Sequence, residues 1–252
     1  MDLKLIFEKP KTMTDNKTHY CPGCGHGVIH RLVAEVIDEL GIREKTVGIA
    51  PVGCAVNAYE YWDIDMCEAA HGRVAAVATG IKRARPDLIV FGYQGDGDLA
   101  AIGLAETLHA ANRGENITII FVNNATYGMT GGQTAPTTLP GQITKTSPYG
   151  RDVSTEGYPM RISEMIAMLE APAYVERVAV VSTETINRTK QAIKRAFKLQ
   201  LEGKGYSFVE VLSGCPNEWH LNPVEANRWI EENMMKYFPL GVYKDRYGIA
   251  KV

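Results

Sequence analysis

The chain has 252 residues, of which 45% are hydrophobic and 22% are charged, a composition typical of a globular protein with a sizeable core. Lys and Arg number 27 against 29 Asp and Glu, so no strong electrostatic field favours nucleic acid or an anionic membrane as a partner. Residues 1–11 lack the apolar segment of a secretion signal, and no apolar run of about 18 residues follows. We therefore expect a cytoplasmic protein that does not span a membrane.

Helical and strand-like segments alternate along the chain. Apolar residues at helical spacing over 27–40, with Gly41 as the stop, predict the first helix. Further helices are expected over about 72–85, 98–111, 182–203 and 223–237, and strands over 46–52, 88–93, 117–122, 174–181 and 207–212. This alternation predicts one α/β domain over residues 1–252, with a doubly wound, mostly parallel sheet and helices on both faces. Residues 125–165, rich in Gly, Thr and Pro, predict a long irregular loop of the kind that is usually functional.

Chemically reactive residues follow four of the predicted strands directly. They are Cys54, the turn Gly95–Asp98, the pair Asn123-Asn124, and Cys215. Parallel sheets of this class bind ligands outside the carboxyl ends of their strands. We therefore expect these four segments to converge on one edge of the sheet.

The segment Gly95-Asp96-Gly97 joins a predicted strand to a predicted helix. Glycines permit close backbone approach, helix N-terminal amides bind phosphate, and a carboxylate suits Mg²⁺. Taken alone, the segment is more simply a turn. Together with Asn124, 28 residues later, it resembles the thiamine diphosphate motif. That resemblance makes Asp96, Asn124 and the Thr126 carbonyl the Mg²⁺ ligands, with Gly97, Asp98 and the backbone of residues 127–133 around the diphosphate.

Five cysteines in a chain without a secretion signal indicate metal binding or catalysis before disulfides. Cys21 and Cys24 stand just before a predicted helix, whose N-terminus favours thiolate charge. With Cys54 and Cys215 they would make four ligands, which suits either zinc or an iron–sulfur cluster. Zinc ligands usually come as two close pairs, whereas Cys54 and Cys215 are single and 161 residues apart.

A family resemblance covers residues from about 18 to 220. Its motifs are Cys21-Pro22-Gly23-Cys24-Gly25-His26, Pro51-Val52-Gly53-Cys54, His71-Gly72-Arg73, Gln94-Gly95-Asp96-Gly97-Asp98 and the segment 123–133. In this order they resemble the beta subunits of 2-oxoacid:ferredoxin oxidoreductases, in the 2-oxoisovalerate and 2-oxoglutarate branch. The resemblance implies a sheet of the thiamine-diphosphate-binding type and a cluster-binding loop at about 18–26. It also implies one [4Fe–4S] cluster held by Cys21, Cys24, Cys54 and Cys215, while Cys67 matches no ligand position.

The resemblance also assigns the cofactor-binding residues. They are Val52, Gly53, Cys54, Ala55, His71, Gly95, Gly97, Asp98, Tyr127, Gly128, Met129, Thr130, Gly131, Gly132 and Gln133. His71 either contacts an anion or is structural, His26 either donates to the cluster or packs beside it, and His109 is expected to pack. No side chain of this chain is expected to be catalytic, because thiamine diphosphate is the catalyst. The activating glutamate would lie on an alpha subunit that carries the pyrimidine-binding domain.

The implied reaction is oxidative decarboxylation of a 2-oxoacid to acyl-CoA and CO₂, with coenzyme A as co-substrate. Electrons would pass through the cluster to ferredoxin, and gamma and ferredoxin-like delta subunits are further expected partners. Two alternatives stay open. A non-redox thiamine-dependent decarboxylase or synthase subunit would share Asp96 and Asn124 without needing four cysteines. A zinc-stabilised binding module would use the cysteines but not the thiamine motif.

The charged and apolar residues of the long loop bear on the choice of substrate. Residues 126–144 contain no Lys, Arg or His, although a buried distal carboxylate would need a charged partner. A branched-chain substrate such as 2-oxoisovalerate is therefore expected ahead of 2-oxoglutarate. Met129, Leu139 and Ile143 are either an apolar substrate pocket or local loop core. Lys145 and Arg151, later in the loop, are the alternative partners for a distal carboxylate.

Overall fold

The computed structural model describes residues 8–248. The ends of the predicted domain, residues 1–7 and 249–252, lie outside the described residues. A seven-stranded sheet has the order β2-β1-β3-β4-β6-β5-β7. The strands are β1 Thr46–Ala50, β2 Asp65–Glu68, β3 Ile89–Gly95, β4 Thr118–Asn123, β5 Tyr174–Ala179, β6 Ser207–Leu212 and β7 Gly241–Asp245. All pairs are parallel except β5 with β7, which confirms the mostly parallel sheet.

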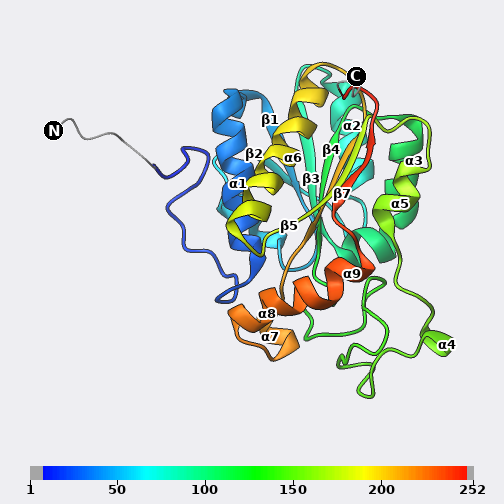
Figure 1. The fold of residues 1–252 in the computed structure, drawn as a ribbon. Helices are drawn as coiled ribbons and strands as arrows, with labels where there is room; N and C mark the ends of the chain where they lie inside the picture. The colour runs from blue at the N-terminus through cyan, green and yellow to red at the C-terminus, as the bar shows by residue number, and fades with distance from the viewer. Residues whose placement is uncertain (1–7, 249–252) are drawn as a thin grey trace.

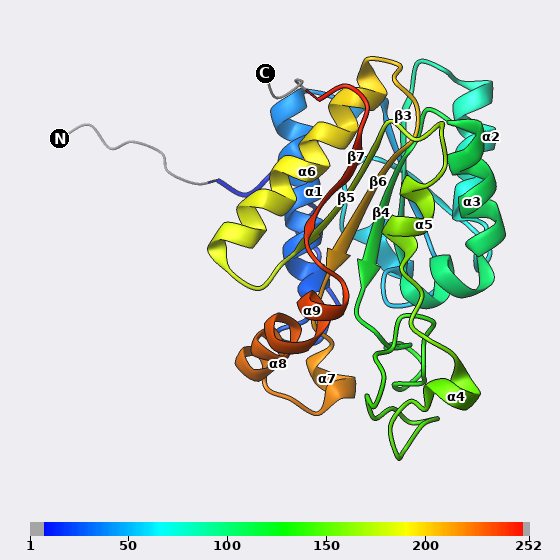
Figure 2. The ribbon, with the colours of Figure 1, turned by 45° about the vertical axis from the view of Figure 1, so that its right-hand side comes forward.

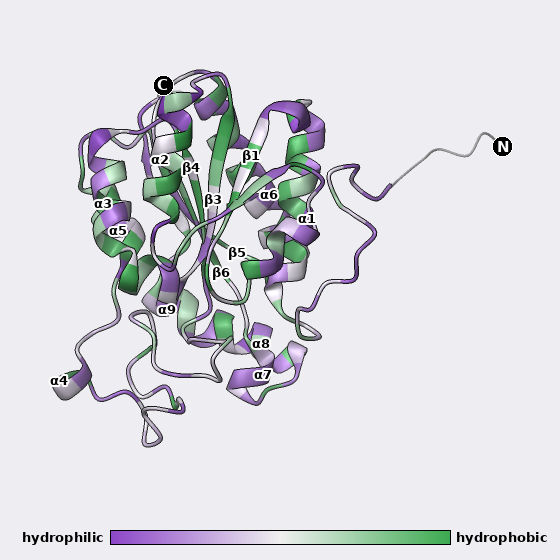
Figure 3. Ribbon diagram, turned by 180° about the vertical axis from the view of Figure 1, so that it is seen from behind, coloured by the Kyte–Doolittle hydropathy of each residue, from purple (hydrophilic) through white to green (hydrophobic). Residues whose placement is uncertain are grey.

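Helices cover both faces of the sheet (Figures 1 and 2). On one face lie α1 Gly25–Leu40 and α6 Thr183–Leu201, and on the other α2 Val74–Ala84, α3 Leu104–Arg113 and α5 Ile162–Ala167. Each face has its own apolar core, one around Ile29 and Phe197, the other around Val74 and Phe121. Figure 3 shows the central strands largely green between helices whose outer parts are purple. This confirms the doubly wound architecture.

Local signals fix several boundaries. Gly41 ends α1 with a φ of 63°, a left-handed conformation that glycine adopts at little cost. Ser182 caps α6 through a reciprocal capping box with Thr185. Beneath the carboxyl ends of the strands lie short helices: α4 Val153–Glu156, α7 Pro216–Trp219, α8 Pro223–Trp229, the π-helical η4 Ile230–Met234 and α9 Met235–Tyr237 (Figure 1). A third apolar cluster, which includes Ala125 and Phe238, packs α7, α8, η4 and α9 against the sheet edge.

The structure differs from the predicted elements at several places. Both edge strands, β2 and β7, were not expected; β2 has the sequence DMCE, with little apolar pattern, and neither strand is fully buried. The turn at Gly95 leads first into a π-helix, η3 Gly97–Ile102, and only then into α3. Two 3₁₀ turns, η1 Arg43–Lys45 and η2 Val56–Glu60, flank β1, and α5 begins inside the predicted loop. No helix in the part of the chain that the structure describes is long and apolar enough to cross a membrane.

Arg151 organises the long loop from its inside. Its side chain is buried, and its guanidinium donates to six backbone carbonyls of the same loop. The acceptors are the carbonyls of Ala135, Pro136, Thr138, Glu156, Gly157 and Tyr158, at 2.6–3.4 Å. Charge-assisted bonds of this kind are stronger than neutral ones, and each lost partner leaves a carbonyl unsatisfied. An irregular segment without its own backbone ladder is thereby held in one conformation.

We predict that Arg151→Lys loosens this loop while leaving the sheet intact, because a single ammonium cannot reach six carbonyls. Amide hydrogen exchange in residues 134–158 should accelerate by at least about tenfold, the effect of losing about one charge-assisted hydrogen bond. The control is Arg161→Lys, since Arg161 is exposed and its guanidinium lies 4.7 Å from the centre of the Tyr237 ring. Equal exchange in the two variants would contradict the role given to Arg151.

Candidate functional site

A cavity of about 150 Å³ opens at the carboxyl ends of β1, β3 and β4. Five parts of the chain line it: the start of α1 at His26, the loop after β1, His71 before α2, the turn after β3 and the start of the long loop after β4. The lining residues are His26, Pro51, Val52, Gly53, Cys54, Ala55, His71, Gly95, Asp96, Gly97, Asp98, Asn124, Thr126, Tyr127, Gly128, Met129 and Thr130. The structure thus brings together the segments that the sequence predicts to converge. Gly131, Gly132 and Gln133 are not among the lining residues.

Asp96 is the buried acidic centre of this cavity. Its Oδ1 accepts from the backbone N–H of Gly97 at 3.0 Å. Its Oδ2 accepts from the Thr126 N–H at 3.1 Å and from the Thr137 hydroxyl at 2.8 Å. Burial raises the pKa of Asp96 to about 7, although these three hydrogen bonds favour the charged form. All three donors are neutral, so no positive charge among these partners offsets the burial of the carboxylate.

Two further groups, the Asn124 side chain and the Thr126 carbonyl, lie beside this carboxylate. The end of the Asn124 side chain is 3.2 Å from Asp96 Oδ2 and 2.7 Å from the Thr126 carbonyl oxygen, and without a cation its NH₂ group satisfies both acceptors. A bound cation would be faced by the amide oxygen instead, after the amide turns over. Neighbouring ligands of an octahedral Mg²⁺ are about 2.9 Å apart when the metal–oxygen distance is about 2.0–2.1 Å. The two distances at Asn124 are compatible with this ligand spacing.

Asp98 lines the same cavity, and its expected role at the diphosphate stays a prediction. Its carboxylate is almost fully buried and already accepts four hydrogen bonds. Oδ1 accepts from the N–H groups of Val52 at 3.3 Å and Gly72 at 2.9 Å, and contacts His71 Nδ1 at 2.6 Å. Oδ2 accepts from the Gln94 amide at 2.6 Å. Asp98 therefore ties the loop after β1 and His71 to the turn after β3, and it holds the cavity wall.

The glycines of the two loops serve different purposes. A Cβ on Gly97 would lie 2.1 Å from Cε1 of Tyr127, so only glycine lets that ring pack across the turn. Gly131 and Gly132 have φ values of 106° and 86° and form a reversal in which the Gly132 N–H donates to the Tyr127 carbonyl. The side chain of Gln133 bonds to Thr130 in the same reversal. These three residues shape the loop behind the cavity.

A second cavity, of about 240 Å³, contains all four predicted cluster cysteines. Its lining is His19, Tyr20, Cys21, Cys24, Cys54, Asn124, Gly128, Met129, Cys215, Pro216, Asn217 and Glu218. A Cβ on Gly128 would lie 3.3 Å from the sulfurs of both Cys54 and Cys215, so this glycine allows the two thiols to approach the same loop. Cys54, Asn124, Gly128 and Met129 line both cavities. The two sites share one wall.

The four cysteines come from three places at the same edge, since Cys21 and Cys24 share one turn. Cys24 is the N-cap of α1, Cys54 follows β1, and Cys215 precedes α7. Gly23, with a φ of 78°, packs so closely on α8 that a Cβ would lie 2.3 Å from Pro223. Burial raises the pKa of Cys24, and it raises those of Cys54 and Cys215 to about 12. These thiols stay protonated unless a bound metal centre holds them as thiolates.

Cys67 lies apart from these four. It is on the edge strand β2, and its thiol faces the backbone carbonyl of Glu68 at 3.6 Å. It lines neither cavity.

The histidines have separate environments. His26 is buried, its Nδ1 lies 2.7 Å from the Tyr93 hydroxyl, and its ring stacks on Tyr20 at 4.9 Å. Burial lowers the pKa of His26 to about 4, so it is neutral. His26 and His71 line the cavity around Asp96, and His26 is absent from the lining of the cavity with the four cysteines. His109, expected to pack, is instead exposed on α3.

The loop residues considered for substrate contact lie in different environments. Met129 lines both cavities, whereas Leu139 belongs to the apolar cluster beneath the sheet and Ile143 is exposed. Arg151 is committed to the loop carbonyls, so the suggestion that it binds a distal carboxylate was wrong. Lys145 is exposed, and its Nζ lies 3.3 Å from where a Cβ on Gly131 would be.

Sequence reasoning missed three groups of this site. Thr137 donates to Asp96 from within the long loop, while Tyr20 and Glu218 line the cysteine cavity. Glu218 could have been suspected from the sequence, since it stands only three residues after the predicted cluster ligand Cys215. Thr137 gave none, because only the folded loop brings it to Asp96.

Comparison with known proteins places the chain in a family. Residues 52–211 match the family model of the thiamine pyrophosphate enzyme, C-terminal TPP binding domain. The chain is 52% identical over 241 residues to the ketoisovalerate oxidoreductase subunit VorA of Methanothermobacter thermautotrophicus, covering 96% of this chain but 50% of that protein. It is 36% identical to the 2-oxoglutarate synthase subunit KorB of Archaeoglobus fulgidus, covering 87% of this chain and 78% of that protein. The chain thus spans about half the length of the VorA relative.

A solved structure shows the same fold. It is 2-oxoglutarate:ferredoxin oxidoreductase from Magnetococcus marinus with 2-oxoglutarate, coenzyme A and succinyl-CoA bound. The match has a TM-score of 0.78 and 28% identity, over 98% of this chain and 88% of that one. The chain therefore belongs to the thiamine-pyrophosphate-binding subunits of the 2-oxoacid:ferredoxin oxidoreductase family.

Proposed function

We propose that this chain provides the thiamine diphosphate site and a [4Fe–4S] site of a multi-subunit 2-oxoacid:ferredoxin oxidoreductase. The observation that carries the proposal is the wall shared by two cavities. Cys54, Gly128 and Met129 line both the cavity around Asp96 and the cavity with four cysteines. A redox centre in the second cavity would adjoin an organic cofactor in the first.

The residues present fit a Mg²⁺-bound diphosphate. Asp96 Oδ2, the Thr126 carbonyl and, once its amide turns over, Asn124 Oδ1 would hold the ion, because the end of the Asn124 side chain lies 3.2 Å and 2.7 Å from the other two oxygens. The backbone of Gly95 and Gly97, together with the loop from Tyr127 to Thr130, would surround the diphosphate oxygens. His71, held by Asp98, would present its other ring nitrogen to the same cavity.

The residues present also fit an iron–sulfur cluster. Cys21, Cys24, Cys54 and Cys215 line one cavity, as four thiolate ligands of a single cluster would. Zinc ligands usually come as two close pairs, whereas Cys54 and Cys215 are single and come from separate loops, so this arrangement favours the cluster over the zinc alternative.

Bound thiamine diphosphate would supply the carbanion chemistry that removes CO₂ from a 2-oxoacid, and the cluster would accept electrons. The chain's own residues position and shield these groups. Asp96 and Asp98 are the carboxylates in the diphosphate cavity, and both are occupied by hydrogen bonds. This supports placing the activating glutamate on an alpha subunit with the pyrimidine-binding domain. Gamma and delta subunits, ferredoxin and coenzyme A complete the proposed system.

The non-redox thiamine decarboxylase or synthase stays the alternative function. It would use Asp96 and Asn124 in the same way. It gives no reason for four cysteines from distant parts of the chain to line one cavity beside Asn124. The oxidoreductase accounts for both features, and the VorA and KorB relatives carry the corresponding names.

The cluster is tested by the visible spectrum of the anaerobically purified chain. We expect a broad brown absorbance that dithionite bleaches, because the cluster accepts an electron. Replacement of Cys21, Cys24, Cys54 or Cys215 by Ser should lower iron content and absorbance. The matched control is Cys67→Ser, which should leave both unchanged. If iron binding requires Cys67 but not Cys215, the ligand assignment is wrong.

The metal site is tested by Asp96→Asn, which preserves shape and removes the charge. We expect Mg²⁺-dependent thiamine diphosphate binding to weaken by at least about tenfold, as alteration of metal-site residues commonly does. Calorimetric titration with thiamine diphosphate at fixed Mg²⁺ measures the effect. The control is Asp87→Asn, a surface carboxylate that is paired with Arg85. Unchanged affinity in Asp96→Asn would remove Asp96 from the metal site.

For the substrate we propose an aliphatic, branched-chain 2-oxoacid such as 2-oxoisovalerate. Neither cavity lining contains a Lys or Arg among the described residues, so a distal carboxylate would find no charged partner there. Arg151 is committed elsewhere, which removes one of the two candidate cations of the loop. The higher identity to the ketoisovalerate relative than to the 2-oxoglutarate relative, 52% against 36%, agrees with this choice.

Relative kcat/KM values for 2-oxoisovalerate, pyruvate and 2-oxoglutarate, measured on the assembled complex, test the substrate proposal. We expect the highest value for 2-oxoisovalerate. The same series on Lys145→Ala shows whether the remaining loop cation contributes. A preference for 2-oxoglutarate that disappears in Lys145→Ala would show that Lys145 binds the distal carboxylate, and a preference that persists would place that contact on a partner subunit.

A further inference from the structure

The oxygens of Asn124 and Thr126 are held by an unusual turn. Ala125, between them, has a φ of 54°, a left-handed conformation that costs a non-glycine residue free energy. Its N–H donates to Asn123 Oδ1 at 3.1 Å, and its carbonyl accepts from the Thr138 hydroxyl at 2.7 Å. These bonds hold the turn, and the turn directs two of the three proposed metal ligands toward Asp96.

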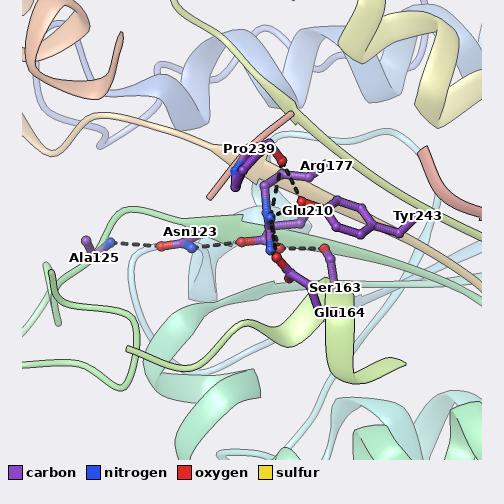
Figure 4. Close-up of polar contacts among 8 residues, drawn as sticks. All are labelled: Asn123, Ala125, Ser163, Glu164, Arg177, Glu210, Pro239 and Tyr243. Atoms are coloured by element: carbon purple, nitrogen blue, oxygen red, sulfur yellow. Dashed lines mark hydrogen bonds and ion pairs between the residues drawn. The ribbon is translucent and has the colours of Figure 1, made fainter. Parts of the chain in front are cut away.

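The amide of Asn123 is itself fixed by Glu210. Both side chains are buried, and Asn123 Nδ2 donates to Glu210 Oε1 at 2.8 Å (Figure 4). A carboxylate oxygen accepts only, so it obliges the amide to present its NH₂. The amide oxygen then has to face the Ala125 N–H. Glu210 therefore determines which way round Asn123 lies.

The second carboxylate oxygen of Glu210, Oε2, is held by two other side chains. Oε2 accepts from the Ser163 hydroxyl at 2.5 Å and from Arg177 Nε at 2.9 Å (Figure 4). Arg177 is fully buried and also contacts Glu164, Tyr243 and the Pro239 carbonyl. The positive charge of Arg177 offsets the cost of burying an ionised Glu210. The chain of contacts runs from α5, β5 and the C-terminal segment to the metal-binding turn.

We propose that Glu210 is a positioning residue for the metal site, acting through Asn123 on the turn at Ala125. The inference rests on the proposed Mg²⁺–diphosphate function of Asn124 and Thr126. Glu210 touches neither the metal nor the cofactor, and it lies outside both cavity linings. Its contribution is the hydrogen-bond direction that it imposes on Asn123.

The direction of the hydrogen bond between Asn123 and Glu210 can be tested by exchanging the amide and the carboxylate. In Glu210→Gln, the single carbonyl oxygen would stay with Arg177 and Ser163, and the new NH₂ would face the NH₂ of Asn123. Asn123 would then turn over and lose the Ala125 N–H. In Asn123→Asp, two buried carboxylates would face each other.

The double variant Glu210→Gln/Asn123→Asp should restore the arrangement. The amide introduced on β6 would donate to the carboxylate introduced at the end of β4. That carboxylate would again accept from the Ala125 N–H. The exchange moves one negative charge from β6 to β4, so the total buried charge is the same as in the original chain.

The experiment uses the full chain with two measurements. In the ligand-free protein, NMR follows hydrogen exchange of the Ala125 amide. Calorimetry then follows Mg²⁺ binding in the presence of saturating thiamine diphosphate. We expect each single variant to accelerate exchange and weaken Mg²⁺ by at least about tenfold, as loss of a buried hydrogen bond implies. In the double variant, both the Ala125 exchange rate and the Mg²⁺ affinity should return to within about threefold of the values of the original chain, a smaller change than the tenfold effect of each single variant.

The matched control is Glu176→Gln. Glu176 is also buried and lies on the neighbouring strand β5, but its carboxylate bonds to Tyr174 and Arg188 and not to Asn123. It should leave Ala125 exchange and Mg²⁺ affinity unchanged. If folded Glu210→Gln behaves like the original chain, or the double variant is no better than the singles, the inference is wrong. If the original chain binds no Mg²⁺ and thiamine diphosphate, the proposed function fails, and Ala125 exchange still decides whether Glu210 holds the turn.

Discussion

The burial of one carboxylate without a cation of its own is the constraint on which the site depends. Asp96 follows the end of the central strand β3 and accepts hydrogen bonds from its own turn, from the turn after β4 and from Thr137 in the long loop. These donors bring three segments to one point but do not neutralise the charge, and burial still raises the pKa of Asp96 to about 7. Together with the Thr126 carbonyl and the Asn124 side chain it forms a position whose spacing is compatible with a divalent cation.

The shared wall between the two cavities follows from the order of the strands. β1, β3, β4 and β6 lie side by side and run parallel, so the residues after them gather at one edge. Cys54 follows β1 and Cys215 follows β6, on either side of the turns that carry Asp96 and Asn124. Gly128 lies close to both sulfurs, where any side chain would crowd them. The parallel topology, together with Gly128, therefore places Cys54 and Cys215 near the turns that carry Asp96 and Asn124.

The central part of this arrangement could be predicted from the sequence. Apolar runs and helix stops gave the parallel core strands, and the rule for carboxyl ends placed Cys54, Asp96, Asn124 and Cys215 at one edge. The edge strands β2 and β7 could not be found, because half-exposed strands need little apolar pattern. The roles of Arg151, Thr137 and Glu210 were also out of reach. Each depends on a hydrogen bond between residues that are far apart along the chain or inside an irregular loop, and no local pattern encodes such contacts.

The most direct test of the account is a crystal structure of the chain with Mn²⁺ and thiamine diphosphate, with the ion located by its anomalous scattering. The account predicts an ion about 2.1 Å from Asp96 Oδ2, Asn124 Oδ1 and the Thr126 carbonyl, the distance typical of Mg²⁺ and oxygen. It also predicts diphosphate oxygens on the open side of the ion. An ion elsewhere, or an Asn124 amide that donates to Asp96 with the cofactor bound, would contradict it.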